Sequence, residues 1–216
     1  MVSIANYIER EQDFTRDASH ELRTPVAIIK SSLKLLEGME LGNEQREHLR
    51  KIESANERMA QTINTLLAMA RQSSSSEAST KVLAVVETVI VEQSPLLEGK
   101  DVEVEVLLAD NQELPVSKEH LHILMTNLIG NAFQYTSKGQ VEIGYQDDRL
   151  YVKDTGSGID EALIDKVTDT LIKGESSEGF GIGLSLVKRL CEFLAIEMQI
   201  DSSQKGTEIS LRFPQN

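Results

Sequence analysis

The sequence predicts an α + (α+β) chain, a helical hairpin followed by an α/β sandwich. Residues 1–72 contain only two glycines, both in the segment EGMELGNE, and otherwise repeat apolar residues with helical spacing. A serine-rich run, RQSSSSEAST, comes next, and beyond it alternating segments and amphipathic segments follow one another. Strands that pair around hairpins, with helices packed on one side, form an α+β sandwich and not a parallel doubly wound sheet.

The first part should consist of two helices, over about residues 4–37 and 44–72, joined at the two glycines. The apolar stripe of the second helix is formed by Leu49, Ile52, Met59, Ile63, Leu66, Leu67 and Ala70. Two helices cannot bury such stripes by themselves. A four-helix bundle made from two hairpins can bury them, so we expect a homodimer through residues 1–72.

The serine run carries no periodicity and predicts a linker over residues 73–80, which makes residues 81–216 the second domain. In chain order, we expect a helix over 82–97, a strand over 102–109, a helix over 118–136 capped by Ser117, two strands over 140–154 joined by an Asp-Asp turn, helices over 159–171 and 185–194, and a hairpin over 197–214.

The negative charge is concentrated in the second part. The net charge is −13; residues 1–72 hold 10 basic and 11 acidic residues, which leaves 12 basic and 24 acidic residues beyond them. Such an acidic domain argues against nucleic acid or an anionic membrane as its partner. If it binds a polyanion, it must use backbone amides, a metal ion and a few placed cations.

No segment indicates membrane insertion or export. No window approaches the ~18 consecutive apolar residues of a membrane span, and the N-terminus lacks the basic-then-apolar layout of a signal peptide. We therefore expect a soluble chain in the cytoplasm. The single cysteine, Cys191, falls in a helical pattern, which predicts a small buried thiol and not a reactive one.

The stretch SHELRTP places a histidine on an outward helical face. At about 100° per residue, His20 lies opposite the apolar stripe of the first helix, and Thr24 lies on its face one turn along. Glu21, on the flank, can hold or deprotonate the imidazole and leave one ring nitrogen free as a nucleophile. Pro25 should bend the helix just after the histidine, because it cannot donate to the carbonyl four residues earlier.

The segment FTRDASHELRTPVAIIKSSLKLL resembles the H box of the sensor histidine kinases of two-component systems, in the HisKA variant of their dimerisation and phosphotransfer domain. The resemblance implies that His20 accepts the phosphoryl group of ATP and that Glu21 acts as the base. It further implies that Thr24 helps to position water for dephosphorylation of the partner protein. Threonine at that place is what bifunctional members of the family carry.

Three segments of the second part are suited to bind a nucleotide. Asn127, Asn131 and Gln134 share one edge of the helix over 118–136, where amides can bind Mg²⁺ and phosphate oxygens. In VKDTGSGID, a carboxylate at Asp154 accepts but cannot donate, so it would select the amino group of adenine over the keto group of guanine. In EGFGIGLSLVKRL, glycines open a helix whose exposed amides suit a polyphosphate. Alone, the asparagine pattern is more often a solvated helix edge, the DTGSG segment is equally typical of a plain turn with a capping aspartate, and the glycine loop is a weak signal.

The helix over 118–136 should also contribute to the core. Its predicted core stripe is Leu121, Leu124, Met125, Leu128 and Ala132.

In this order the three segments resemble the N, G1 and G2 boxes of the GHKL ATPase superfamily, which includes histidine kinase catalytic domains, gyrase, MutL and the heat-shock chaperone ATPases. The resemblance implies that Asn131 is the main Mg²⁺ ligand, supported by Asn127, and that Asp154 contacts adenine. Thr207 resembles the threonine beside that aspartate, and Tyr135 follows the NAxxYT pattern. The nucleotide-binding glycines and leucine implied by the boxes are Gly156, Gly158, Gly179, Gly181, Gly183 and Leu184.

Two positions depart from the family pattern. Gln134 stands where a basic residue usually contacts phosphate, and it keeps a donor without the charge. Between the G1 and G2 boxes a motif with two phenylalanines is expected, but Thr168 and Leu171 stand there and the lid is short. Lys173 is a candidate for the missing cation. Weaker nucleotide affinity or a lid that closes poorly is therefore a hypothesis for this chain.

Taken together, the residues and the resemblance predict an ATP-dependent protein-histidine kinase that phosphorylates itself on His20. It should pass the group to an aspartate of a response regulator, dephosphorylate that regulator, and use ATP and Mg²⁺ as cofactors. Two alternatives stay open: a kinase-impaired dimeric scaffold or phosphatase that binds a response regulator, and an ATPase in the manner of gyrase or MutL. We expect the chain to be the cytoplasmic portion of a membrane-anchored sensor, with no membrane contact in this segment.

Overall fold

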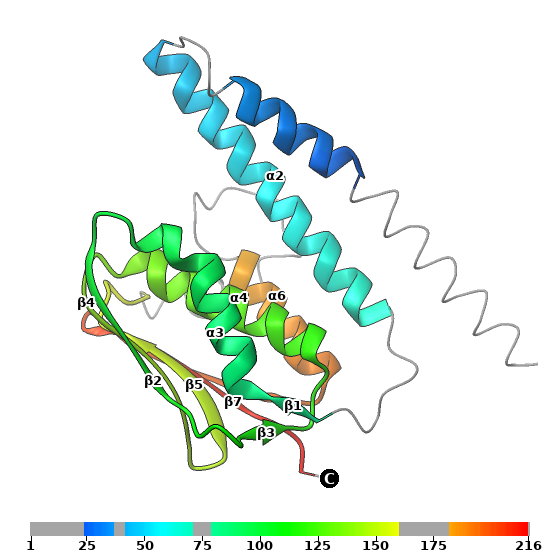
Figure 1. Ribbon diagram of the computed structural model, residues 1–216, viewed down its shortest axis with the longest axis vertical. Helices are drawn as coiled ribbons and strands as arrows, with labels where there is room; N and C mark the ends of the chain where they lie inside the picture. The colour runs from blue at the N-terminus through cyan, green and yellow to red at the C-terminus, as the bar shows by residue number, and fades with distance from the viewer. Residues whose placement is uncertain (1–23, 37–41, 71–78, 160–181, 216) are drawn as a thin grey trace, which may run out of the picture. The chain divides into compact units, whose positions relative to one another are not determined.

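The computed structural model of the chain describes residues 24–36, 42–70, 79–159 and 182–215 (Figure 1). The chain divides after Ser73 into two compact units. Each unit has a buried apolar core of its own, which is small in the first unit and extensive in the second.

The first unit contains a helix over residues 24–36 and the long helix α2 (Asn43–Ala70) (Figure 1). Gly42 forms two hydrogen bonds with the first turn of α2: its N–H donates to Gln45 Oε1 at 2.9 Å, and its carbonyl accepts from the Arg46 N–H at 3.0 Å. The predicted second helix is thereby confirmed. The predicted first helix is confirmed over 24–36, and its earlier residues lie outside the described ranges.

The hairpin buries only part of its apolar surface. Leu33, Leu49 and Leu67 are buried, whereas Ile52 and Met59 of the predicted stripe are exposed. A polar contact also joins the two helices: the buried side chain of Asn56 donates from Nδ2 to the Val26 carbonyl at 3.2 Å.

The second unit is a mixed sheet with helices. Its elements are β1 (Thr80–Lys81), α3 (Val82–Gln93), the 3₁₀ helix η1 (Ser94–Leu97), β2 (Asp101–Leu107), β3 (Glu113–Leu114), α4 (Lys118–Tyr135), β4 (Lys138–Gln146), β5 (Arg149–Asp154), α6 (Ile182–Phe193), β6 (Glu197–Ser203) and β7 (Gly206–Arg212). The larger sheet has the strand order β2-β4-β5-β7-β6, in which β2 is parallel to β4 and the other neighbours are antiparallel. A second, two-stranded sheet pairs β1 with β3.

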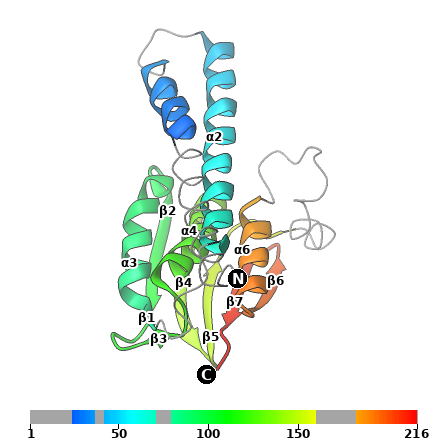
Figure 2. The same ribbon diagram turned by 90° about the vertical axis from the view of Figure 1, so that its right-hand side faces the viewer.

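The helices α3, α4 and α6 cover one face of the five-stranded sheet (Figures 1 and 2). Strand residues alternate accordingly: Val141 and Ile143 of β4 and Leu150 and Val152 of β5 are buried, while the residues between them are more exposed, except the buried Gly144. All five predicted core residues of α4 are buried, together with Ile129 and Phe133. The α/β-sandwich prediction is confirmed.

Most predicted elements of this unit are present. The Asp-Asp turn joins β4 to β5, with φ of 51° at Asp147 and 59° at Asp148, and the closing hairpin is β6–β7. The predicted helix over 82–97 ends earlier as an α-helix, because Pro95 stands in the 3₁₀ turn η1 and lacks an N–H for the α-helical ladder. The predicted helix over 159–171 falls almost wholly outside the described residues.

Two local predictions can also be checked. Ser117 caps α4, since its side chain accepts the His120 N–H at 3.2 Å. Cys191 is buried, and this burial raises the pKa of its thiol to about 12. No helix among the described residues has an apolar stretch long enough to cross a membrane.

Candidate functional site

Two asparagines of α4 meet the first turn of α6. Asn127 is buried, and its Nδ2 donates to the Ile123 carbonyl at 2.8 Å, which leaves its Oδ1 as an acceptor. A Cβ added to Gly183 would lie 3.2 Å from Asn127 Oδ1 and 3.5 Å from Asn131 Oδ1. Because glycine has no side chain, both amides can approach the start of α6. The structure thus brings the predicted residues Asn127, Asn131 and Gly183 together.

Amide oxygens are ligands that suit Mg²⁺. Within the described ranges, no group of three or more His, Cys, Asp or Glu side chains is placed to hold a metal ion. The Oδ1 atoms of Asn127 and Asn131 are hard donors that lie together beside Gly183. Their chemistry fits a cation that takes its remaining ligands from water and phosphate oxygens.

Asp154, the last residue of β5, holds a half-buried carboxylate. Its Oδ1 accepts the Gly156 N–H at 2.8 Å. Burial raises the pKa of Asp154, while the backbone amides of Gly156 and Thr207, which donate to the carboxylate, oppose the rise. The result is a fixed acceptor in a poorly hydrated place, an arrangement suited to recognising a hydrogen-bond donor on a ligand.

The loop after Asp154 packs closely against two other segments. A Cβ on Gly156 would lie 2.5 Å from the Tyr135 carbonyl oxygen at the end of α4, and one on Gly158 would collide with the backbone carbonyl of Ser203. Gly158 also has a φ of +71°. Glycine is required at both positions for steric reasons, and the loop is held between α4 and the β6–β7 hairpin.

A hydroxyl network connects this loop to Thr207. Thr207 is buried, and its Oγ1 lies 2.8 Å from Ser202 Oγ, which also accepts the Ile159 N–H at 2.8 Å. Ser202 is absent from the site predicted by sequence. The available sequence signal for Ser202 was its place in the alternating pattern of β6. The two residues that it contacts, Ile159 and Thr207, lie 43 and 5 positions away along the chain.

Gln134 is exposed on α4, and Leu184 is buried in α6. A cation binds the backbone at the end of α4: Lys100 Nζ donates to the Phe133 carbonyl at 2.6 Å and to the Gln134 carbonyl at 2.9 Å. A cation at this end satisfies free carbonyls and complements the helix dipole.

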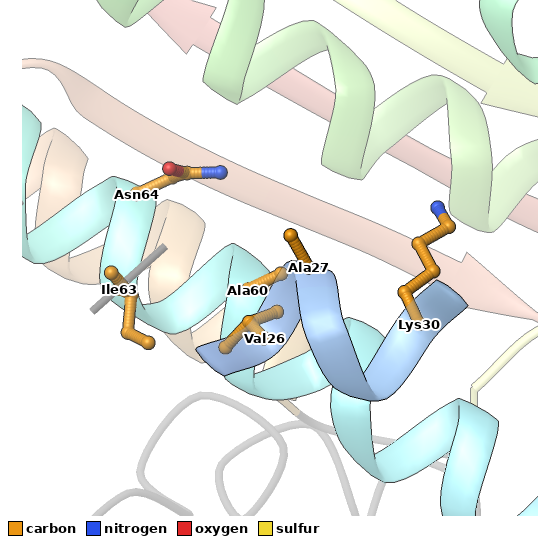
Figure 3. Close-up of a pocket in the computed structure, with 6 residues that line it drawn as sticks. All are labelled: Val26, Ala27, Lys30, Ala60, Ile63 and Asn64. Carbon is orange, nitrogen blue, oxygen red and sulfur yellow. The ribbon is translucent and has the colours of Figure 1, made fainter. Parts of the chain in front are cut away.

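The hairpin carries a separate pocket of about 250 Å³ (Figure 3). It is lined by Val26, Ala27, Lys30, Ala60, Ile63 and Asn64. Figure 3 shows these side chains coming from both helices of the hairpin, with those of Lys30 and Asn64 spread apart. The pocket is smaller than typical small-molecule sites of about 300–1,000 Å³ and is mainly apolar, so it is not the nucleotide site.

The remaining predicted site residues divide into two groups. Thr24 is exposed at the described start of the helix over 24–36. The residues His20, Glu21, Lys173, Gly179 and Gly181 lie outside the described ranges.

Two family models match the chain. Residues 10–75 match HisKA, the His Kinase A (phospho-acceptor) domain. Residues 116–216 match HATPase_c, the Histidine kinase-, DNA gyrase B-, and HSP90-like ATPase. The two matches follow one another in the order in which the two units occur and together span most of the chain.

Known histidine kinases resemble the chain along nearly its whole length. Sensor histidine kinase YkoH of Bacillus subtilis is 27% identical over 225 residues, covering 97% of this chain and 49% of that protein. The structure of histidine kinase AdeS of Acinetobacter baumannii is similar with a TM-score of 0.61 at 20% identity, covering 91% of this chain and 98% of that one. Full-length ShkA in complex with AMPPNP gives a TM-score of 0.57 at 23% identity, covering 92% of this chain and 45% of that one. The two structures support the fold, and the chain spans about half or less of the length of its curated relatives.

Proposed function

The chain belongs to the sensor histidine kinases of two-component systems, and from this premise we propose that it is an ATP-dependent protein-histidine kinase. It phosphorylates itself on His20 and passes the phosphoryl group to an aspartate of a response regulator. Residues 1–72 act as the dimerisation and phosphotransfer domain, and residues 81–216 act as the ATP-binding domain. Residues 73–80 are the linker that lets the ATP-binding domain reach His20.

The observation that carries the proposal is the convergence of two glycine segments on α4. Asn127, Asn131 and Tyr135 are spaced four residues apart and so follow one edge of the helix. The first two face Gly183, and the backbone carbonyl of the third lies against Gly156. Gly156 and Gly183, which are 27 positions apart in the chain, are thereby gathered at one helix edge, which is what a site for an extended nucleotide requires.

Each end of this edge has chemistry for one end of ATP. Asp154 accepts the adenine amino group, with Thr207 beside it. Asn131, supported by Asn127, holds the Mg²⁺, which neutralises phosphate charge when bound. The amides of the glycine segment around Gly179, Gly181 and Gly183 contact the phosphates. Lys173 supplies the positive charge that a basic residue at position 134 would provide and that Gln134 does not carry.

The phosphoryl step needs positioning and charge neutralisation more than covalent chemistry. A His20 ring nitrogen attacks the γ-phosphorus, the P–N bond forms as the P–O bond to the β-phosphate breaks, and ADP leaves. Glu21 holds the other ring nitrogen and accepts its proton. The second transfer moves the group from the P–N bond to a carboxylate oxygen of the regulator.

A homodimer supplies the bundle in which His20 is presented. The exposed apolar residues of the hairpin occur in pairs seven positions apart: Ile28 with Leu35, Ile29 with Leu36, and Ile52 with Met59. A seven-residue repeat of apolar side chains is typical of helices that pack against further helices. A second hairpin would cover them, which supports dimerisation through residues 1–72.

The further roles follow from the same domain. Thr24 positions water for dephosphorylation of the regulator, so Thr24→Ala should slow that reaction and spare labelling of His20. The kinase acts in the cytoplasm as part of a membrane-anchored sensor, and its partners are a second copy and a receiver domain, not nucleic acid.

The decisive experiment incubates the full chain with γ-labelled ATP and Mg²⁺ and then treats the labelled protein with acid and alkali. We expect label that is acid-labile, alkali-stable and absent from His20→Ala. His48→Ala is the matched control, since His48 is an exposed histidine of the same hairpin and should leave the labelling unchanged. Nucleotide binding without any label would contradict the kinase and favour the regulator-binding scaffold or phosphatase.

A further inference from the structure

A buried asparagine stands in the apolar heptad pattern of α2. The residues at the heptad spacing of three and four positions are Leu49, Ile52, Asn56, Met59, Ile63, Leu66 and Ala70. Asn56 is the one polar residue among them. Its side chain is only 2% exposed, so it lies inside the hairpin and not on its surface. Because apolar neighbours cannot satisfy an amide, its burial requires a specific partner.

The partner of Asn56 is the backbone of the other helix. Its Nδ2 donates to the Val26 carbonyl at 3.2 Å, across 30 positions of the chain. A carbonyl oxygen cannot donate, so the amide NH₂ group is necessarily the donor in this contact. Val26 lies within the helix over 24–36, and its carbonyl has a second lone pair for the helical N–H four residues along. The Oδ1 atom of Asn56 is buried and has no hydrogen-bond partner within the described part of the chain.

This arrangement costs stability and defines geometry. A buried acceptor without a partner destabilises the fold relative to an apolar side chain at the same place. The hydrogen bond is directional, unlike an apolar contact, and it links one residue of α2 to one residue of the facing helix. In coiled coils, a single buried asparagine at a heptad position fixes the register of the helices at such a cost. The contact is therefore suited to setting the register of this hairpin.

Apolar packing beside the contact is incomplete. Val26 also lines the pocket of about 250 Å³ on the hairpin, together with Ala60, which comes about one turn after Asn56 on α2 (Figure 3). Where side chains do not fill the space between two helices, packing alone leaves the helices room to shift against each other. The Asn56 hydrogen bond thus restrains the facing helix at a place where packing restrains it less.

We propose that Asn56 is a positioning residue for the phosphoryl acceptor: it fixes the register of the first helix against α2 and so sets where the segment that carries His20 is presented. The proposal rests on the proposed kinase function. Val26 directly follows Pro25, where the sequence predicts a bend, and comes six positions after His20. Asn56 thus holds the helix just beyond the predicted bend. It acts through the backbone of Val26 and takes no part in the chemistry.

Asn56→Leu tests this role, because leucine has the branching of asparagine but no donor. With saturating γ-labelled ATP and Mg²⁺, the rate of His20 labelling should fall at least about 5-fold, since a misplaced acceptor slows the transfer. The KM for ATP should stay within about twofold of the wild type, because the proposed ATP site lies in the other unit. The urea midpoint, followed by helical circular dichroism, should be unchanged or higher.

Asn56→Ala removes the same donor without adding bulk, so it should show the same loss of rate if leucine proves too large for the site. Rates are compared at a temperature at which circular dichroism shows each variant to be folded. A loss of rate in a folded variant with an unchanged KM is what a purely structural role would not produce.

Thr65→Val is the matched control, because Thr65 is another buried polar residue of α2. Its hydroxyl donates to the Gln61 carbonyl at 2.9 Å within the same helix, so it does not link the two helices. Labelling of Thr65→Val should stay within about twofold of the wild type.

The outcomes separate this inference from the proposed function. An unchanged labelling rate in Asn56→Leu and Asn56→Ala, or a changed KM for ATP alone, overturns the positioning role while the kinase stands. A loss of rate that follows a lowered urea midpoint, or that Thr65→Val shares, shows general loosening of the hairpin and overturns it as well. If the wild type takes no label on His20, the proposed function is wrong, and the role of Asn56 is lost with it.

Discussion

At the scale of single residues, Asp154 is a carboxylate whose partly buried environment disfavours its charged form. Burial raises its pKa above the ordinary value of 3.8, even though two backbone amides donate to the carboxylate. The folded state therefore binds the proton more tightly than the unfolded state. The free energy of unfolding then decreases as the pH rises from the ordinary pKa through the raised one. An acceptor kept at a cost in stability is typical of a binding site.

Asp154→Asn should separate binding from stability. Asparagine keeps one carbonyl acceptor for the backbone amides but is uncharged, and its NH₂ group opposes the adenine amino group. ATP affinity should fall about 10- to 100-fold, while the free energy of unfolding at neutral pH should be unchanged or rise by up to about 1 kcal/mol. Calorimetry and urea unfolding would measure the two quantities. A variant that binds ATP normally would contradict the role of Asp154.

The pH dependence of binding gives an independent check on the same residue. Wild-type affinity for ATP should fall as the pH drops through the raised pKa of Asp154, because a protonated carboxyl loses acceptor strength. In Asp154→Asn this part of the pH dependence should be missing. Equal pH profiles for the two proteins would show that another group governs binding.

Among the secondary-structure elements, α4 organises the site. Ser117 caps its start, and Lys100 binds the Phe133 and Gln134 carbonyls at its end. Both termini are thus held by hydrogen bonds from outside the helical ladder. Its buried side chains pack into the core of the unit, while Asn127 and Asn131 reach the start of α6. The positions of the asparagines are therefore as rigid as the core beneath them.

Gly183→Ala tests this contact between α4 and α6. The added Cβ would lie 3.2 Å from Asn127 Oδ1, so it enters the space where we place the metal ion and phosphates. ATP affinity should fall at least about 10-fold, although alanine favours the helix by up to about 1 kcal/mol over glycine. Gly130→Ala is the matched control, because its Cβ would also lie 3.2 Å from an amide oxygen, that of the flexible Gln93 side chain. Equal affinities for the two variants would contradict the placement.

The β4–β5 turn offers a test of stability alone. Asp147 and Asp148 both adopt positive φ, as a two-residue hairpin turn with right-handed strand twist requires. Asp148→Gly should raise the free energy of unfolding by about 0.5–1 kcal/mol, because glycine adopts this conformation without strain. Asp110→Gly, in a loop without positive φ at that residue, should give no gain. Urea midpoints compare the two, and no gain at Asp148 would show that the aspartate is not strained.

On the scale of the whole molecule, the hairpin surface predicts assembly. Leu35 is 72% exposed, Ile28 59%, Ile52 52% and Met59 46%, which is unusual for apolar side chains that repeat every seven residues. Burying them in a second hairpin follows from the hydrophobic effect, at roughly 25 cal/mol per Å² of apolar surface. Dimerisation would also bring a second ATP-binding domain near each His20.

Met59→Glu should therefore convert the dimer to monomer at micromolar concentration, as measured by light scattering coupled to gel filtration. The reason is that a carboxylate would be buried without a partner in the bundle. Gln61→Glu adds the same charge to an exposed residue about half a turn away on α2, and it should leave the dimer intact. A dimer that persists in Met59→Glu would place the contact elsewhere.

The sequence by itself determined the features that depend on neighbouring residues. Helical spacing over many turns predicted α2 and α4, period-two alternation predicted the strands, and Ser117 and the Asp-Asp pair marked a helix start and a turn. The H box around His20 predicted the histidine kinase family, and the order of the asparagine and glycine segments predicted the GHKL ATPase superfamily. These signals are local, because hydrogen bonding within a helix or turn links residues only a few positions apart.

Only the tertiary structure decided the features that depend on distant residues. The parallel pairing of β2 with β4, the short β1–β3 sheet, and the approach of Gly183 to Asn127 join segments with no shared periodicity. Ser202 is a clear case. Along the chain it is one polar residue of an alternating strand, and its hydrogen bond with the Ile159 N–H forms because the loop of Ile159 packs against β6. Such contacts arise when a whole layer of helices packs on a sheet, and side-chain periodicity reports which face is buried but not which distant group lies against it.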